Sequence, residues 1–149
     1  RLDAMPGLQH RDRVAIPNDP ANIGRALRLL AEADVIELRE GAGIRAGLSD
    51  VVRNPKRLRF IEMEPSLMAG MLKDVAAAVI PVNFALAAGL NPGRDAIFLE
   101  KPDSPYANVL VVRKNEKRPK VLKLAEALRS PAVRAFILER YRGARTPAF

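Results

Sequence analysis

The stretch VAIPNDPANIGRAL, residues 14–27, constrains the fold of this chain more than any other. Its short apolar run, residues 14–16, stops at Pro17, and the polar pair Asn18-Asp19 follows just ahead of Pro20. Asn and Asp at such a position are typical of a helix start, because their side-chain oxygens accept hydrogen bonds from backbone N–H groups without helical partners. The stretch therefore predicts a strand over residues 14–16, a polar turn, and a helix over residues 20–33.

A helix that starts at the carboxyl end of a strand is the place where α/β proteins bind anionic groups. Arg25 lies about one turn into the predicted helix, and its planar guanidinium suits a carboxylate. Asn18 and Asn22, from the same turn, are weaker candidates for ligand binding. The alternative is a structural role, with Asn18 as a helix cap and Arg25 in a surface ion pair.

Strands and helices alternate along the rest of the chain, which favours an α/β fold with a parallel-type sheet and flanking helices. Residues 75–82 form a continuous apolar run, as expected for a central parallel strand that is covered on both faces. The other expected strands are residues 35–38, 57–62, 96–99 and 108–112, and the other expected helices are residues 48–53, 65–74, 84–90, 119–128 and 131–141.

The residues needed for most catalytic and metal sites are missing. The chain of 149 residues has one His, no Cys and no Gly-rich phosphate loop, so we expect no enzyme, no metal site and no cofactor. His10 lies in a polar stretch and is expected to face solvent. Glu62 and Glu64, two residues apart, could form an acid/base pair, but a solvated pair at a strand end is the favoured interpretation.

The net charge of +8 raises the alternative of a nucleic-acid partner. The basic residues fall into several separate groups, and aromatic residues, at 5% of the chain, are not interleaved with them. Single-strand binders use such aromatics as stacking platforms, so we expect no nucleic-acid binding. The longest apolar stretch is strand-sized, which predicts no transmembrane helix.

Four segments carry a family resemblance: PNDPANIGRAL (17–27), AAVIPVNFALAAGLNP (77–92), DSPYANVLVVR (103–113) and YRGARTPAF (141–149). In their order and spacing, the chain resembles the NlpA-type lipoproteins, the periplasmic methionine-binding components of ABC importers. The resemblance implies a periplasmic-binding-protein-like (type II) fold. Residues 1–95 would form its second lobe, and residues 96–149 would supply return strands and C-terminal helices of the first lobe. The family chain is longer at its N-terminus.

The resemblance also implies roles for single residues. In the family, the arginine of the PNDP helix and the asparagine of the SPYxN segment help to hold the amino-acid head of the ligand, and these roles fall on Arg25 and Asn108. Pro81 departs from the family, because it stands where a ligand-holding amide is usual and has neither an N–H nor a polar side chain. Asn83, on the same side of an extended chain, is the expected substitute.

The implied function is capture of methionine or a related amino acid for the membrane subunits of an ABC importer. The implied location is the periplasm or cell surface, lipid-anchored in the full-length form through an upstream Cys. Without a complete first lobe, the return segments would leave strand edges and an apolar helix face uncovered. This predicts either a segment-exchanged homo-oligomer or a protein whose first part is not included in this sequence. The alternatives are a divergent paralogue that acts as an oligomeric or interaction module without a ligand, and a basic nucleic-acid-binding domain.

Overall fold

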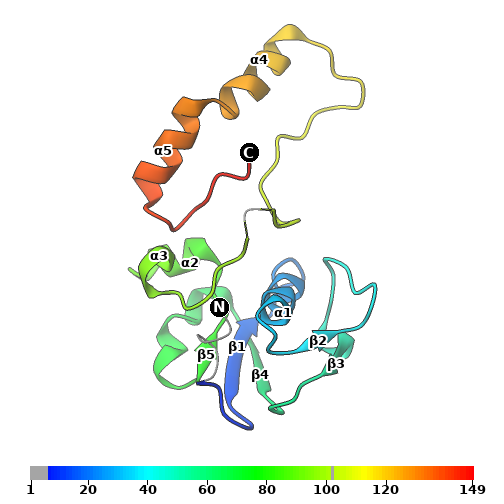
Figure 1. Ribbon diagram of the computed structural model, residues 1–149, viewed down its shortest axis with the longest axis vertical. Coiled ribbons are helices and arrows are strands. Elements are labelled where there is room, and N and C mark those ends of the chain that lie inside the picture. Colours follow the sequence, from blue (N-terminus) through cyan, green and yellow to red (C-terminus); the bar gives the residue numbers. More distant parts are fainter. Residues whose placement is uncertain (1–6, 102) are drawn as a thin grey trace. The chain divides into compact units, whose positions relative to one another are not determined.

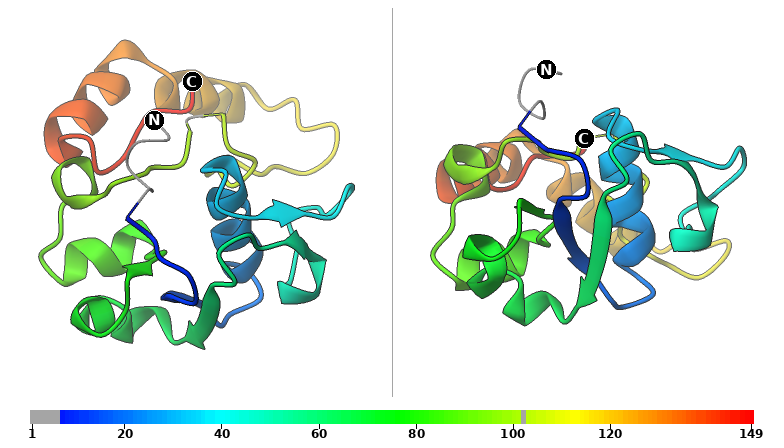
Figure 2. Two further views of the ribbon diagram at one scale, coloured as in Figure 1. Left: turned by 60° about the horizontal axis from the view of Figure 1, so that its bottom comes forward. Right: turned by 90° about the horizontal axis from the view of Figure 1, so that it is seen from below.

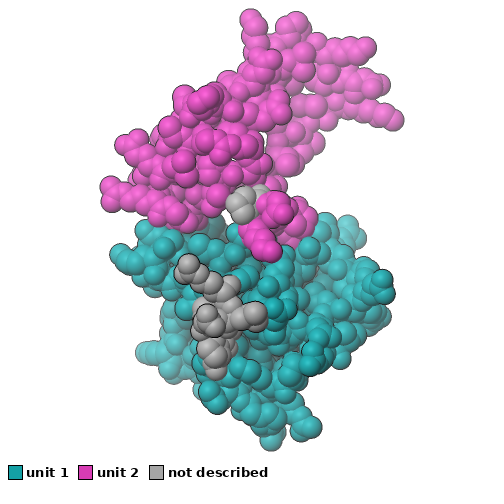
Figure 3. Space-filling view, viewed as in Figure 1, with its two compact units in different colours: residues 1–100 teal, residues 101–149 magenta. Residues whose placement is uncertain are grey.

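The computed structural model describes residues 7–101 and 103–149. The chain divides into two compact units, residues 1–100 (unit 1) and residues 101–149 (unit 2), which Figure 3 distinguishes by colour. Each unit is described by itself. The expected assignment of residues 96–149 to a first lobe stays a prediction.

Unit 1 is built on a three-stranded parallel sheet with the strand order β4-β1-β5 (Figure 1). The strands are β1 (Arg13–Pro17), β4 (Arg59–Met63) and β5 (Ala77–Ala78). Residues of β1 pair with β4 on one side and with β5 on the other, both in the parallel sense. The predicted α/β fold with a parallel sheet and flanking helices is confirmed.

The centre of this sheet is β1, where the side chains of Val14, Ala15 and Ile16 have no exposed surface. The prediction that residues 75–82 form the central strand is wrong. Only two residues of that run form β5, which pairs with β1 on one side and has no further neighbour among the described strands. Because it is paired on one side only, most of the run is half-buried rather than enclosed.

Helix α1 (Ile23–Glu32) runs along one face of the sheet, as Figure 2 shows. Ala26, Leu27 and Leu30 are buried, and their spacing of three and four residues places them on one side of the helix. They join the strand residues of β1 in a single apolar cluster with Val35, Ile36 and Leu58. Burial of a side chain such as Leu27 contributes about 1.5–3 kcal/mol, so this cluster is the main source of stability in unit 1.

Gly24 allows a loop to approach α1 closely. A Cβ atom at this position would lie 2.5 Å from the backbone oxygen of Ile44 and 3.1 Å from the nitrogen and oxygen of Ala46. All three obstacles are backbone atoms, which cannot rotate away as a side chain can. The first turn of α1 therefore has a fixed position against residues 44–46.

The next part of unit 1 differs from two of the predictions. The predicted helix over residues 48–53 is a 3₁₀ turn, η2 (Leu48–Asp50), followed by a strand, β3 (Val51–Arg53). β3 pairs antiparallel with β2 (Glu37–Leu38), and this partner, distant in sequence, decides its conformation. The predicted helix over residues 65–74 consists of two 3₁₀ turns, η3 (Pro65–Leu67) and η4 (Gly70–Lys73). Gly70 disfavours a continuous helix there.

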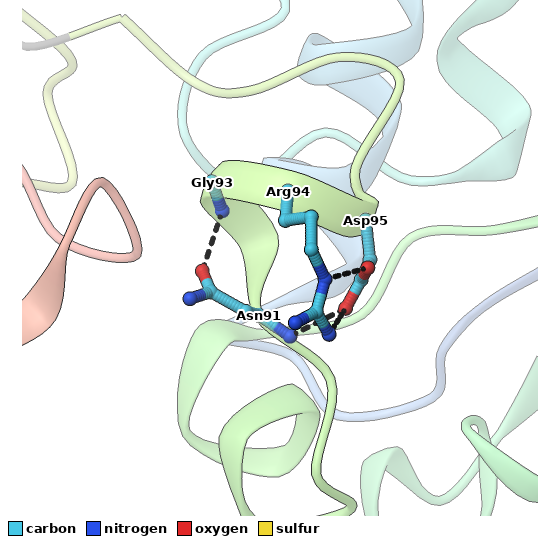
Figure 4. A network of polar contacts seen from close by, with 4 residues as sticks. All are labelled: Asn91, Gly93, Arg94 and Asp95. Atoms are coloured by element: carbon cyan, nitrogen blue, oxygen red, sulfur yellow. Dashed lines mark hydrogen bonds and ion pairs between the residues drawn. The ribbon is translucent and has the colours of Figure 1, made fainter.

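Unit 1 ends with two short helices, α2 (Val82–Ala87) and α3 (Pro92–Asp95). Figure 4 shows how α3 begins: the side-chain oxygen of Asn91 accepts a hydrogen bond from the Gly93 N–H at 3.0 Å. The carboxylate of Asp95 accepts a second one from the Asn91 N–H at 2.8 Å. These reciprocal bonds satisfy N–H groups that a helix start leaves without partners.

Unit 2 contains two helices, α4 (Pro119–Leu128) and α5 (Pro131–Tyr141), at the predicted positions. Ser130 accepts a hydrogen bond from the Val133 N–H at 3.3 Å and so caps α5. The prediction of strands over residues 96–99 and 108–112 is wrong, since both segments are irregular. A strand forms by pairing, and neither segment pairs with a strand among the described residues. The side chains of Val109 and Val111 are 77% and 82% exposed.

The charge of the chain is divided between the two units. Residues 1–100 carry equal numbers of basic and acidic side chains, so the whole net charge of +8 belongs to residues 101–149. Within the ranges 7–101 and 103–149, no helix is both long enough and apolar enough to span a membrane.

Candidate functional site at the carboxyl edge of the sheet

The three parallel strands end at one edge of the sheet. β1 leads into Asn18, β4 into Glu64, and β5 into the short link that precedes α2. Ligands of open α/β sheets bind at this carboxyl edge, where strands pass into the starts of helices. Two neighbouring strands, β1 and β5, are followed here by α1 and α2, so this edge is the candidate site.

Asp19 organises the turn between β1 and α1. Its Oδ1 atom accepts hydrogen bonds from the backbone N–H of Ala21 at 3.1 Å and of Asn22 at 3.0 Å. The alternative of Asn18 as the helix cap is wrong, because the N-cap position of α1 is Asn22 and Asn18 is exposed. The Asp19-centred turn precedes the helix, which is why α1 begins at Ile23 rather than at residue 20.

The side chain of Asn22 belongs to the same turn. Its amide nitrogen donates to both carboxylate oxygens of Asp19, each at 3.0 Å. Asn22 stands at the N-cap position of α1, but its own side chain makes no capping bond. These hydrogen bonds give the Asn22 side chain a structural role, because they stabilise the turn before α1.

Arg25 lies in the first turn of α1 and forms an ion pair with Glu100. Its Nε atom donates to Glu100 Oε2 at 2.8 Å, and its Nη2 atom contacts the same oxygen. The two side chains are 40% and 23% exposed, so the pair is partly screened from water. The guanidinium thus already holds a carboxylate at the carboxyl edge, which is the chemistry that an amino-acid ligand requires.

Asn83 is exposed and is the second residue of α2. The expectation that it lies in an extended chain beyond Pro81 is wrong. Pro81 is the N-cap of α2, with φ −61° and ψ 139°, and the helix begins at Val82. Residues two apart on a helix point in different directions, whereas in a strand they share a face. Asn83 and Pro81 therefore do not share a face as they would in an extended chain.

Asn108 is exposed in an irregular segment of unit 2. The structure thus groups Asn18, Asn22 and Arg25 around the start of α1, and it places Asn83 on another helix of the same unit. Asn108 belongs to unit 2.

Sequence reasoning named Asp19 together with Asn18 as a helix-start signal without choosing between them, and it missed Glu100 as the partner of Arg25. Asp19 stands beside Asn18, and both residue types suit a cap, so no local signal separates them. Glu100 is 75 residues from Arg25 in the sequence, and nothing in the spacing predicts that contact.

Each unit also contains a pair of charged side chains with shifted pKa values. In α3, the hydrogen bond from Arg94, together with that from the Asn91 backbone, holds the pKa of Asp95 below its usual value, and the same contact raises the pKa of Arg94 (Figure 4). In unit 2, hydrogen bonds from Arg118 lower the pKa of Glu116. The described residues contain no group of three or more acidic or His side chains that could hold a metal ion.

A hollow of about 420 Å³ lies at the other end of α1, between its last turn and the β2–β3 hairpin. Its lining combines apolar side chains with charged ones, among them Leu38, Asp34, Glu37 and Arg53. Two of its charged side chains, Glu37 and Arg53, are already paired with each other. Ligands of open α/β sheets bind where strands pass into the starts of helices, so we assign the candidate site to the carboxyl edge.

Comparison with known proteins identifies a family and several relatives of this chain. The family model described as NlpA lipoprotein matches residues 2–149. Outer membrane lipoprotein 3 of Mannheimia haemolytica is 38% identical over 97% of this chain and 55% of its own length. The D-methionine-binding lipoprotein MetQ of Escherichia coli is 39% identical over 89% of this chain and 50% of its own length. The chain thus spans about half the length of the curated relatives that it matches.

Solved structures give the same result for the fold. A nutrient-binding protein from Burkholderia cenocepacia bound to methionine has a TM-score of 0.79 and 43% identity, and the match covers 97% of this chain and 62% of that protein. A periplasmic substrate-binding protein of an ABC transporter from Coxiella burnetii has a TM-score of 0.79 and 38% identity, with 96% and 60% covered.

Proposed function

The chain belongs to the NlpA lipoprotein family, and from this premise we propose that it captures methionine or a related amino acid, without chemical change, for an ABC importer. The observation that supports the proposal most is the position of Arg25. Its guanidinium lies in the first turn of the helix after the central strand, and it is already engaged with a carboxylate.

The proposed ligand has two charged groups at its head, a carboxylate and an ammonium. Arg25 would bind the carboxylate through parallel N–H donors, and the amide of Asn108 would contribute both a donor and an acceptor. Asn108 enters by resemblance to the family. Asn18, Asn22 and Asn83 are secondary candidates, and Asn22 would have to share an amide that already bonds to Asp19.

The proposal extends to the setting of the protein. Its partners are the membrane subunits of an importer, and its place is the periplasm or cell surface, with a lipid anchor in the full-length form. Relatives are named as lipoproteins and as a periplasmic substrate-binding protein, which supports this setting. Binding rather than catalysis is proposed, and neither a cofactor nor a nucleic acid takes part.

A thermal melt of the 149-residue chain with and without millimolar L-methionine tests the proposal. A ligand that binds only the native state raises stability, by about 2.7 kcal/mol at a concentration of 100 times Kd. We expect an upward shift of Tm that is lost in Arg25→Ala and Asn108→Ala. Arg28→Ala, which removes an arginine from the same helix outside the proposed site, is the matched control and should keep the shift.

An unchanged Tm with L-methionine, D-methionine and methionine dipeptides would reject ligand capture by this chain. The second candidate is then the interaction module, in which exposed apolar segments pair with a second copy. It is supported by the exposure of Val109, Val111 and Phe136, whose side chains face solvent. Sedimentation separates these cases, since a compact monomer contradicts segment exchange. Salt-sensitive retention on DNA would instead favour the nucleic-acid alternative.

A further inference from the structure

Glu100 is an acidic residue to which the family resemblance assigns no role, and it contacts the arginine of the proposed site. It is the last residue of unit 1, and its carboxylate meets Arg25 across 75 residues of sequence. One oxygen, Oε2, accepts from both Nε and Nη2 of the guanidinium. Glu100 is therefore attached to one edge of a planar group, the edge formed by Nε and Nη2.

We propose that Glu100 is a positioning residue for ligand binding: it holds the Nε–Nη2 edge of Arg25 and thereby turns the Nη1–Nη2 edge toward the carboxylate of the ligand. The inference rests on the proposed function. A guanidinium offers two such edges in a rigid plane, so fixing one edge fixes the direction of the other. An arginine that is oriented in advance loses less conformational freedom when the ligand arrives.

The backbone next to Glu100 is well placed for this task. Phe98, two residues earlier, packs against the apolar core of unit 1, so the carboxylate comes from an anchored segment. The Glu100 side chain is only 23% exposed, against 57% and 63% for the Glu37–Arg53 pair on the hairpin. Less exposure means less screening by water, so the contact constrains Arg25 more than a surface pair would.

The geometry of the contact between Glu100 and Arg25 favours a positioning role for Glu100 over a role as an internal substitute for the ligand carboxylate. A carboxylate that replaced the ligand would meet the guanidinium with two oxygens in two parallel bonds, the arrangement that arginine favours. Glu100 instead uses a single oxygen for both contacts. Its loss should therefore weaken ligand binding, whereas loss of a competitor would strengthen it.

Calorimetric titration of the 149-residue chain with L-methionine and with L-methioninamide tests the inference, because the amide lacks the carboxylate that Arg25 would bind. We expect Glu100→Gln, which keeps the shape and removes the charge, to weaken methionine binding about tenfold, in line with the loss of one charge-assisted hydrogen bond. Binding of the amide should stay unchanged. Glu37→Gln, which breaks the exposed hairpin pair, is the matched control and should alter neither affinity.

Tighter binding of methionine by Glu100→Gln would identify a competitor and overturn the inference. An unchanged affinity, or equal weakening for both ligands, would overturn it as well, because a merely structural role does not distinguish the carboxylate. If the parent chain binds no methionine, the proposed function fails, and the inference about ligand binding fails with it.

An NMR measurement without ligand keeps the two failures apart. The Nε–Hε signal of Arg25, identified by its disappearance in Arg25→Lys, should shift and exchange faster with water in Glu100→Gln. A changed signal together with unchanged methionine affinity would show that the pair exists but does not position the ligand. An unchanged signal would remove the structural basis of the inference.

Discussion

Replacement of Gly24 by alanine would test how tightly the start of α1 is held against the loop beside it. The new Cβ would lie 2.5 Å from the Ile44 backbone oxygen, whereas ordinary contacts begin at 3.4 Å, so helix and loop must separate by about 0.9 Å. Forcing an extra methyl group into a packed site costs about 1–3 kcal/mol, and backbone obstacles favour the upper end. Alanine regains about 1 kcal/mol as a better helix former. We therefore expect a net loss of about 2 kcal/mol.

Urea unfolding followed by circular dichroism at the helix band measures this loss. With a slope of about 2 kcal/mol per M, the midpoint should fall by about 1 M. Gly70→Ala is the matched control, because a Cβ at Gly70 meets nothing within 4 Å and the residue has no positive φ. Its midpoint should change little. If Gly24→Ala unfolds at the same urea concentration as the parent or at a higher one, the close approach of loop and helix does not constrain the fold.

Three further predictions concern the core, the turn and a helix start. Leu27→Ala, at a side chain with no exposed surface, should lower the free energy of unfolding by about 2–5 kcal/mol, whereas the exposed Leu122→Ala should change it little in the same urea assay. Asp19→Ala removes the bonds that order the turn before α1 and should cost about 0.5–2 kcal/mol, measured as a lower Tm. Asp95 should titrate by NMR below the ordinary value of 3.8, and Arg94→Gln should raise its midpoint. Because the folded-state pKa is lowered, the stabilising contribution of Asp95 is present above pH 3.8 and is lost as the pH falls through the lowered pKa.

Local signals predicted the parts of the fold that depend on neighbours in sequence. The strand at residues 14–16 and the helix after it were readable from an apolar run, a polar turn and helical spacing. Ser130 and the proline after it likewise marked the start of α5. In each case, the residues that form the hydrogen bonds lie within a few positions of one another.

Parts that depend on distant partners could not be predicted in the same way. The apolar run at 75–82 had the pattern of a central strand, but the position of a strand in a sheet depends on which strands pair with it. The β-branched residues Val109, Val111 and Val112 suit a strand, yet a strand also needs a partner, and they pair with none among the described residues. For the site, Arg25 was identified from its position, while its contact with Glu100 exists only in three dimensions.

The placement of β1 between two strands that follow it in the chain has a consequence for the order of folding. Val14 pairs with Phe60 on one side and with Ala77 on the other, so both partners come from sequence that is synthesised much later. Until then, β1 has no hydrogen-bonded neighbour on either side. Contacts across such long sequence separations close slowly. During synthesis, β1 is therefore an apolar segment without its partner strands, and such unpaired segments are prone to aggregation until their partners emerge.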